Sequence, residues 1–582
     1  MLLDGFHWFY YQLSVNLELL CFASFVWFIL YFFLIYPFIL SPLRNIPGPY
    51  THRLGRFQAL RKQRNGSWSE TVHNLHLKYG DVVILSPSEI SVNGSSRYIH
   101  EIYVKNFPKS KFYANFTNHG ARDNIFATLD NETHLKYKKN IMGLYSKSAV
   151  YSHRNRIRNQ IYEKTHLLVE QVHDSSITGN SPDIINAKSE YNDHGKGFIE
   201  GSSWFNKSNR VANLGIDVFS LFGSFAMDLI SAFELGSENG TNFLQDPKSR
   251  FMILLHRTVA SMGFWTTLMP KLWNLAAGPK VRAAAEKVEE WQLQLYKQAE
   301  LNVPDFNVNE NKTTLETLKK KGFKGKDAYS FISDNIFAGH ETTAIQLTYL
   351  TYELSRTCHK HLQQRLQQEL RLTFGDPQSF KDIINDFETL DKLPFLNALL
   401  EENSRVHSSI PGAEPRIVDK TYFINLNNQK PIQIPIGTTI SVLPYSIHRQ
   451  PDIFPQPDHF IPDRWLQSEY ETDQEYKLRI LNQQKYMMPF GKGIRMCLGM
   501  QIALIEMKMA IANLYWHYSS KIDDEWCDIV DYTVSNDKLP NIIKIGRKNV
   551  GNNKTDEEKM VMYDSYTTRP VNDECWLRWF EY

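Results

Sequence analysis

The stretch PFGKGIRMCLG, from Pro489 to Gly499, places a single cysteine, Cys497, among glycines and two basic residues. A cysteine thiolate can act as a nucleophile, a zinc ligand, an iron–sulfur ligand or an axial haem ligand, and each use requires different neighbours. No CxxC partner supports zinc or an iron–sulfur cluster, and no histidine signature of a cysteine hydrolase surrounds the thiol. Met496 stands where a dinucleotide-binding GxGxxG loop needs its third glycine, which argues against that loop.

The same stretch suits a haem. Gly491 and Gly493 permit a tight turn beside a flat cofactor, Arg495 offers a fork for a propionate carboxylate, and Gly499 lets the following helix approach. We expect the first N–H groups of that helix to hydrogen-bond the thiolate of Cys497. The stretch resembles the FxxGxRxCxG haem loop of the cytochrome P-450 family at Phe490, Gly491, Gly493, Arg495, Cys497 and Gly499.

A second motif lies in a predicted amphipathic helix from Asp327 to Leu354. Ala338 and Gly339 stand at its centre, and a glycine inside a helix usually has a reason, for which close passage over a haem face is one candidate. The following residues complete AGHETT, which resembles the oxygen-activation motif of the family. The resemblance implies that Thr342 holds iron-bound dioxygen and a water while Glu341 relays protons. The alternative is a capped, kinked core helix.

A third motif, EENSR, places Glu402 and Arg405 at positions i and i+3 on one helix face. On most proteins this spacing gives only a solvated ion pair worth about a few tenths of a kcal/mol. By resemblance to the family, the pair joins Arg464 of FIPDRWL in a buried trio that supports the haem-loop side of the fold. Loss of one member would then leave a buried charge without its partner, at the expense of folding or haem retention.

The resemblance identifies the residues that bind the haem propionates less clearly. Arg416, in PGAEPRIVDK, matches an arginine that the family uses on a propionate. Where the family often has Trp and Arg on an early helix, this chain has His134 and Lys138. Each is a single donor or point charge rather than a guanidinium fork.

Composition excludes several other classes of protein. The 582 residues include 65 Lys and Arg against 63 Asp and Glu, a net charge of +2, so no basic field favours nucleic acid. The five cysteines are scattered and odd in number, which argues against a disulfide framework or a structural zinc site. We therefore expect the body to lie in a reducing compartment.

The N-terminal region predicts a membrane anchor. Leu19 to Leu40 carries no charge and is long enough to cross a bilayer as a helix, although a buried core helix is the alternative. Basic residues follow it, which predicts a lumenal segment 1–18 and a cytoplasmic catalytic body, 51–582. Between them, 41–50 contains three prolines and a glycine and predicts a stiff strap. The basic residues are Arg44, Arg53, Arg56, Arg61, Lys62 and Arg64.

The body is predicted to be mainly α with small β-sheets, an α+β fold. Helical periodicity dominates, while Tyr79 to Val92 and Lys430 to Pro444 have the composition of strands. Polar insertions are expected at about 174–210 and 523–559. The final stretch YDSYTTRPVNDECWLRWFEY, from Tyr563, regains aromatic and β-branched residues and predicts a closing hairpin.

The resemblance implies a haem-thiolate monooxygenase with haem b, in which Cys497 donates electron density to iron and one oxygen atom of O2 is inserted into a C–H bond. We find no nicotinamide or flavin motif, so electrons are expected from a separate NADPH-dependent reductase, with cytochrome b5 as a second candidate donor. The proline strap, KSKFYANF, PGAEPRIV and the terminal YTTRP to CWLRW segment resemble microsomal, fungal members, which implies the endoplasmic reticulum membrane. Basic residues expected to steer an acidic partner are Lys138, Lys139, Lys492 and Arg495.

Two alternatives remain open at this stage. A haem-thiolate isomerase or dehydratase needs no reductase, and a membrane-anchored haem sensor catalyses nothing; the intact acid and alcohol of AGHETT favour the monooxygenase. A lipophilic or aromatic substrate is expected from the composition of the family's pocket regions, but none is selected. These regions are Ala114 to Thr128, Phe219 to Phe233, Phe331 to Ala338, Ser408 to Ala413 and the terminal hairpin.

Overall fold

The computed structural model describes most of the chain. The described residues are 17–153, 155–175, 215–246, 249–302, 313–426, 430–524, 526–531, 545–546 and 554–582. Most of the expected insertion at 174–210, part of that at 523–559, and nearly all of the expected lumenal segment 1–18 therefore lie outside the described residues.

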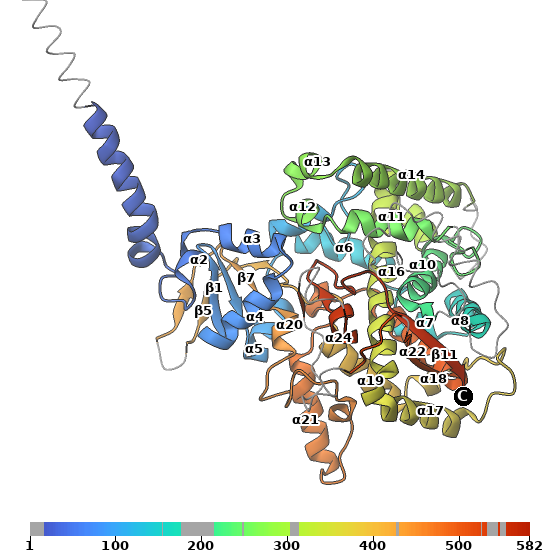
Figure 1. Cartoon of the computed structure of the whole chain (residues 1–582). Coiled ribbons are helices and arrows are strands. Elements are labelled where there is room, and N and C mark those ends of the chain that lie inside the picture. The colour runs from blue at the N-terminus through green and yellow to red at the C-terminus, as the bar shows by residue number, and fades with distance from the viewer. Residues whose placement is uncertain are drawn as a thin grey trace, which may run out of the picture.

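An apolar helix, Leu17–Leu40, extends away from the rest of the molecule (Figure 1). Its most apolar window has a mean hydropathy of 2.4 and none of that window is buried in the body, so the alternative of a core helix is wrong. The structure confirms an apolar N-terminal helix long enough to span a membrane. A second helix of sufficient length and hydropathy, α10 (Val218–Leu235), is wholly buried and belongs to the core.

The last turns of the N-terminal helix are wide, π-type turns (η1, Tyr31–Leu40) around Pro37. Proline has no N–H and its ring clashes with the carbonyl one turn earlier, which loosens the helix and frees that carbonyl. The hydroxyl of Tyr50 donates to the carbonyl of Phe33 at 3.2 Å, and the ring of Tyr50 stacks on Phe38 with centroids 5.2 Å apart. These contacts tie the end of the apolar helix to the start of the body.

The proline strap between them lies on the first sheet. Ile46 is fully buried, and the backbone N–H of Ile84 donates to the carbonyl of Pro47 at 2.8 Å. Gly48 has φ +144°, and a Cβ there would lie 2.7 Å from a side-chain carbon of Ile84, so this close approach requires glycine. Arg53 donates to the carbonyls of Arg44 and Ile46 at 3.0 and 2.5 Å, which closes the strap.

The body is mainly helical with small sheets, as predicted. The longest helix, α16, runs through its centre (Figure 1). The longer helices of the body are α3 (Phe57–Arg64), α4 (Trp68–Tyr79), α6 (Asn131–Ile141), α8 (Arg156–Ser175), α10, α11 (Phe251–Ala260), α14 (Pro279–Asn302), α16 (Lys326–Ser355), α17 (Lys360–Phe374), α19 (Pro394–Val406), α21 (Asp473–Tyr486) and α22 (Met500–His517). The shorter helices are α2 (Tyr50–Leu54), α5 (Ser96–Ile99), η2 (His100–Val104), η3 (Lys111–Phe116), α7 (Lys147–Tyr151), α12 (Gly263–Thr267), η5 (Pro270–Leu272), α13 (Trp273–Ala276), α15 (Thr314–Lys320), η6 (Thr357–His359), α18 (Phe387–Leu390), α20 (Pro444–Ile447), η7 (Pro462–Trp465), η8 (Gly493–Arg495) and α24 (Asp556–Lys559).

Four small sheets frame the helices. The four-stranded sheet has the order β1-β2-β7-β4, in which β1 and β2 are antiparallel and β2 and β7 are parallel. The other sheets are β3-β11-β8, β9-β10 and β5-β6. The strands are β1 (Val82–Ser86), β2 (Glu89–Val92), β3 (Ile216–Asp217), β4 (Arg416–Ile417), β5 (Tyr422–Ile424), β6 (Ile432–Ile434), β7 (Thr439–Ser441), β8 (Tyr518–Ile522), β9 (Ile545–Gly546), β10 (Met562–Tyr563) and β11 (Trp576–Glu581).

Both strand-like stretches of the sequence contain strands, since β-branched residues suit a pleated, half-buried surface. The C-terminal stretch is less simple than one hairpin. Its first part closes a tight loop, in which Val571 donates to the carbonyl of Val561 and Tyr563 to that of Arg569, at 3.1 and 2.8 Å. The final strand, β11, then pairs with β8 and β3 rather than with β10.

Helix α10 packs against α16 in the middle of the core. Gly339 lies at this contact, because a Cβ there would approach a side-chain carbon of Ile230 to 2.7 Å. Packing against a neighbouring helix is therefore a reason for this glycine that the sequence analysis did not give.

The described ends of the second polar insertion are packed into the core. Arg356, which is 2% exposed, lies 2.9 Å from Asp531 and 3.3 Å from Asp556, and donates to Glu557 at 2.9 Å. Burial raises the pKa of Asp556 to about 7 in spite of Arg356. This cluster ties the insertion to the C-terminal end of α16.

Candidate functional site

The cysteine loop is built by backbone hydrogen bonds. The N–H of Cys497 donates to the carbonyl of Phe490 at 2.8 Å, and Met496 donates to Gly493 at 3.1 Å. Gly491 and Gly493 have φ of +68° and +72°, the left-handed region that favours glycine. A Cβ on Gly493 would also lie 2.1 Å from the carbonyl oxygen of Tyr103, so two independent constraints require glycine at this position.

Gly499 is under no such constraint from the chain. Its φ is −82°, and no described protein atom lies within 4 Å of the position that its Cβ would take. The expectation that glycine is needed there to let α22 approach its surroundings therefore has no support among the described protein atoms.

The thiol of Cys497 lies deep in the molecule but remains accessible. Cys497 is exposed to contact by solvent-sized molecules, yet protein atoms surround its thiol and raise the pKa of the thiol by desolvation. Hydrogen bonds from the backbone N–H groups of Gly499 and Met500, and the charge of Lys138, lower that pKa in part. A side chain that is both accessible and surrounded by protein faces an internal space, and the start of α22 directs its N–H groups at the sulfur.

One face of α16 borders the same space. Most residues of this helix are buried, but Ala338 is exposed and Asp334 and Thr342 are partly exposed, at a spacing of four residues. Residues four apart lie on one face of a helix. The charge of Asp334 acts on the thiol of Cys497, so this face and the cysteine loop lie near one another.

The acid and the alcohol of AGHETT are held by different parts of the chain. The hydroxyl of Thr342 donates to the carbonyl of Ala338 at 2.6 Å, and the hydroxyl of Ser409 donates to the carbonyl of Thr342 at 3.0 Å. Burial raises the pKa of Glu341, while Arg569, which lies 3.9 Å away, lowers it in part. Glu341 is 13% exposed, so its carboxylate is reachable but mostly enclosed.

The structure brings Glu402, Arg405 and Arg464 together. Arg405 donates to both oxygens of Glu402, at 2.8 and 2.9 Å, and Arg464 donates to one of them at 3.0 Å. Two further donors to Glu402 were not expected from the sequence, the indole of Trp465 at 2.9 Å and the backbone N–H of Ile461 at 2.8 Å. Burial alone would raise the pKa of Glu402, but Arg405 and Arg464 outweigh it and the pKa is lowered.

Arg405 and Arg464 have additional acceptors. Arg405 donates to the carbonyls of His448, Pro457 and His459 at 2.7–3.1 Å. Arg464 donates to the carbonyl of Pro455 at 2.9 Å. The trio therefore fixes the chain that leads from α19 to the cysteine loop.

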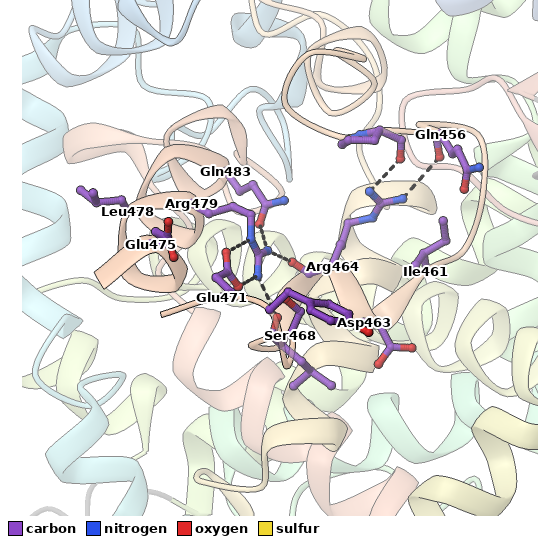
Figure 2. Close-up of a pocket in the computed structure, with 13 residues that line it drawn as sticks. Gln456, Ile461, Asp463, Arg464, Ser468, Glu471, Glu475, Leu478, Arg479 and Gln483 are labelled. Atoms are coloured by element: carbon purple, nitrogen blue, oxygen red, sulfur yellow. Dashed lines mark hydrogen bonds and ion pairs between the residues drawn. The ribbon is translucent and has the colours of Figure 1, made fainter. Parts of the chain in front are cut away.

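Arg464 also lines a hollow of about 810 Å³, shown in Figure 2. Arg479 spans it, donating to Glu471 through two bonds of 2.7 Å and to the carbonyl of Leu466 at 2.8 Å. Neither the cysteine loop nor α16 contributes to its lining, which consists of Pro455, Gln456, Ile461, Asp463, Arg464, Leu466, Ser468, Tyr470, Glu471, Glu475, Leu478, Arg479 and Gln483. This hollow belongs to the supporting segment and not to the site of the thiol.

A cationic cluster surrounds His134 and consists of Lys109, Lys138, Arg416 and Arg495. Burial and these four charges lower the pKa of His134 to about 3, so the imidazole is neutral. Burial and Arg416 also lower the pKa of Arg495 to about 10. Among the described residues nothing hydrogen-bonds to Nδ1 of His134, although this atom is buried.

Two of the residues predicted to donate to a propionate, Arg495 and Lys138, donate instead to backbone carbonyls of the protein. Arg495 donates to the carbonyls of Thr128, Leu129 and Asp130 at 2.8–3.1 Å and to the side chain of Asn131 at 3.0 Å. Its fork therefore ties the cysteine loop to the start of α6. The ammonium of Lys138 donates to the carbonyls of Ile494 and Met496 at 2.9 and 3.1 Å, so it lies on the cysteine loop.

The third predicted propionate donor, Arg416, contacts residues that the sequence analysis did not select. It lies on β4 and donates to the hydroxyl of Tyr113 at 3.0 Å, with the carboxylate of Glu414 at 3.6 Å. Lys109 forms an isolated antiparallel bridge with Arg416 and is 7% exposed. Lys109 and Tyr113 belong to the KSKFYANF segment. Its mix of basic and aromatic residues was the one feature of the sequence that could have identified them as neighbours of Arg416.

These features fit a haem. The accessible thiol faces an internal space bordered by α16. Beside it lie the four cations that act on His134, with the carboxylate of Glu414 at 3.6 Å from Arg416 and that of Asp334 acting on Lys109. Two propionate carboxylates would relieve the repulsion among these cations, and Nδ1 of His134 is available as a hydrogen-bond partner. Cys497 would be the iron ligand, and His134 and Arg416 would hold the carboxylates. Lys109 lies beside them, with its ammonium donating to the carbonyl of Phe126 at 2.6 Å.

Comparison with known proteins gives a consistent result. The family described as Cytochrome P450 matches residues 202–543. The chain is 25% identical over 548 residues to Cytochrome P450 monooxygenase hkm5 of Aspergillus hancockii, covering 87% of this chain and 91% of that protein. It is 26% identical over 501 residues to Cytochrome P450 monooxygenase BOT1 of Botryotinia fuckeliana, covering 81% and 84%. It is 24% identical over 511 residues to the averantin hydroxylase of Dothistroma septosporum, covering 84% and 82%.

Proposed function

Because the chain belongs to the cytochrome P450 family, we propose that it is a membrane-anchored haem-thiolate monooxygenase acting on a lipophilic or aromatic organic substrate. The observation that carries this proposal is the thiol of Cys497, accessible from an internal space and hydrogen-bonded by the N–H groups at the start of α22. Haem b bound at this thiol would supply the chemistry of oxygen activation and insertion.

The residues of this chain have separate tasks in that reaction. The N–H groups of Gly499 and Met500 and the ammonium of Lys138 favour the thiolate form of Cys497 over the thiol. Glu341, which is partly exposed, takes up a proton at its carboxylate and passes it toward the α16 face. The hydroxyl of Thr342 donates its hydrogen bond to the carbonyl of Ala338, so its oxygen is left to accept a hydrogen bond from a water or a protonated group.

The acid and alcohol on α16 favour oxygen activation over the two alternatives. A haem-thiolate isomerase or dehydratase moves no external electrons, and a haem sensor needs no proton delivery. Glu341 and Thr342 would have no task in either.

Aromatic side chains support a lipophilic or aromatic substrate. The ring of Tyr566, in the C-terminal segment, lies 4.8 Å from that of Phe116 and 6.1 Å from those of Phe112 and Phe126. All four side chains are partly exposed. Aromatic walls bind apolar and aromatic groups through buried area and ring contacts.

We place the protein in the endoplasmic reticulum membrane, with residues 1–18 in the lumen, residues 19–40 across the bilayer and the catalytic body, 51–582, in the cytoplasm. The basic residues that follow the apolar helix support this orientation. Electrons would come from an NADPH-dependent reductase, or from cytochrome b5. Lys139, which is exposed, remains a candidate to contact that partner, whereas Arg495, Lys138 and Lys492 each donate to backbone carbonyls.

The test is the reduced, carbon monoxide-bound absorption spectrum of the purified full-length protein. The wild type and the control Cys21→Ala should give the Soret band typical of a thiolate-ligated haem, and Cys497→Ala and Cys497→His should lose it. Folded wild-type protein that binds haem without this band would refute the proposed mechanism. Turnover of NADPH that requires an added reductase would then distinguish the monooxygenase from the isomerase.

A further inference from the structure

The loop between β10 and β11, 564–575, contains the YTTRP stretch and lies beside α16 (Figure 1). Two backbone bonds at its base close the loop, as described above. Thr568 donates from its N–H to the carbonyl of Ser409 at 2.9 Å and from its hydroxyl to that of Ser408 at 3.0 Å. Because Ser409 donates in turn to the carbonyl of Thr342, the loop is connected to α16 at the alcohol of AGHETT.

The next residue of the loop, Arg569, reaches the acid of the same motif. Its guanidinium lies 3.9 Å from the carboxylate of Glu341 and 2.7 Å from that of Asp573. The Arg569 side chain is 1% exposed, whereas Asp573 is 27% exposed. Among the residues that the structure describes, Nη2 of Arg569 finds no hydrogen-bond acceptor, so this buried cation has donor capacity to spare for Glu341.

Few other charges act on Glu341. A hydrogen bond from the side chain of Thr567, in the same loop, and the charge of Arg257, on α11, act in the same direction as Arg569 but less strongly. Asp573 opposes all three. His340, next to Glu341 on α16, is buried and His256, on α11, is partly buried. Desolvation lowers the pKa of each imidazole, so that both are neutral. Arg569 is thus the main cation that favours the ionised form of Glu341.

We propose that Arg569 is a positioning residue for proton delivery, which holds Glu341 ionised and oriented at the α16 face, and that Asp573 limits its effect by competing for the same guanidinium. The inference rests on the proposed function, in which Glu341 relays protons. It assigns a task to the YTTRP stretch, which lies far from AGHETT in the sequence.

The primary test measures the ionisation of Glu341 directly, by infrared difference spectroscopy of the resting full-length protein across pH, with the band assigned through Glu341→Gln. Arg569→Gln should move the titration of Glu341 to higher pH by roughly one unit or more, the shift expected for loss of a unit charge about 4 Å away. Asp573→Asn should move it to lower pH. Arg578→Gln serves as the matched control, since Arg578 lies on β11 and pairs with Asp523 at 3.1 Å.

A second readout is substrate-free NADPH oxidation with a reductase in H2O and in D2O. Slower oxidation with a larger isotope ratio is expected for both Glu341→Gln and Arg569→Gln. If Glu341→Gln changes neither quantity, the relay role of Glu341 in the proposed function fails. If Glu341→Gln has the effect but Arg569→Gln leaves the Glu341 titration in place, the proposed function stands and this inference is overturned.

Arg569 is buried, so Arg569→Gln can fail to fold. Arg569→Lys keeps the charge and should restore most of the wild-type titration, and Asp573→Asn tests the arrangement without touching the arginine. An unshifted titration in Asp573→Asn would contradict the proposed competition.

Discussion

Replacing Glu402 by glutamine should destabilise the folded protein by about 3–5 kcal/mol, the range for breaking a buried ion pair by removal of one partner. Glu402 is fully buried and accepts five hydrogen bonds, three from arginines, one from an indole and one from a backbone N–H. A glutamine has one acceptor oxygen, so at least the two donors on the other oxygen, from Arg405 and Trp465, lose their acceptor. Each buried donor left in this way costs about 1–3 kcal/mol, and the loss of the negative charge between two guanidiniums adds to that.

The backbone acceptors of Arg405 and Arg464 keep this cost from being larger, since both guanidiniums retain carbonyl partners. We would measure urea unfolding of the full-length protein in detergent, following tryptophan fluorescence and the carbon monoxide spectrum together. Glu471→Gln is the matched control. That carboxylate also holds an arginine through two bonds of 2.7 Å, but Arg479 is partly exposed, so its loss should be clearly smaller.

The acid dependence supplies an independent check. Because the pKa of Glu402 is lowered in the folded state, its contribution is present above the unfolded carboxyl pKa of about 4.3 and is lost as pH falls through the folded pKa. The glutamine variant should therefore lose less additional stability in acid than the wild type. A Glu402→Gln protein as stable as the Glu471→Gln control would refute the view that this trio supports the cysteine loop.

Three further outcomes are expected. Gly493→Ala should abolish haem retention, seen as loss of the carbon monoxide spectrum, because the added Cβ meets the carbonyl of Tyr103 at 2.1 Å in a left-handed conformation; retained haem would contradict the geometry. Lys138→Met should raise the pKa of the Cys497 thiol, so that acid converts the thiolate-type spectrum at a higher pH than in the wild type, and an unchanged midpoint would count against the ammonium as a stabiliser. Deletion of 1–40 should move the protein from the membrane to the soluble fraction on a flotation gradient, whereas full membrane retention would show that the body itself binds the bilayer.

The outcome for α16 separates what the sequence predicted from what it could not. Its helix was expected from Asp327 to Leu354 and spans Lys326–Ser355, because a long apolar periodicity fixes a helix locally. The sequence did not predict that Gly339 would contact Ile230 of α10, more than a hundred residues away in the chain. Which face of a helix meets which neighbour depends on packing that no local pattern records.

The basic residues near the cysteine loop also show what the sequence could and could not predict. The sequence selected His134, Lys138, Arg416 and Arg495, and the structure brings all four into one cluster with Lys109. It could not predict that the guanidinium of Arg495 would bind the backbone before α6, or that Lys138 would lie on the cysteine loop. Long flexible side chains choose among acceptors that only the folded chain brings within reach.

The sequence by itself determined the thiol and its glycine-framed loop, the apolar N-terminal helix, the acid and alcohol of α16 and the pair Glu402 and Arg405, because each depends on residue types at short fixed spacings. The third member of the trio, Arg464, was assigned only through the resemblance to the family. The tertiary structure alone decided that Glu402 has five donors, that Gly493 lies against Tyr103, and that Arg569 from the C-terminal loop faces Glu341. These contacts join segments far apart in the chain, and the burial that gives them their strength exists only once the whole body has folded.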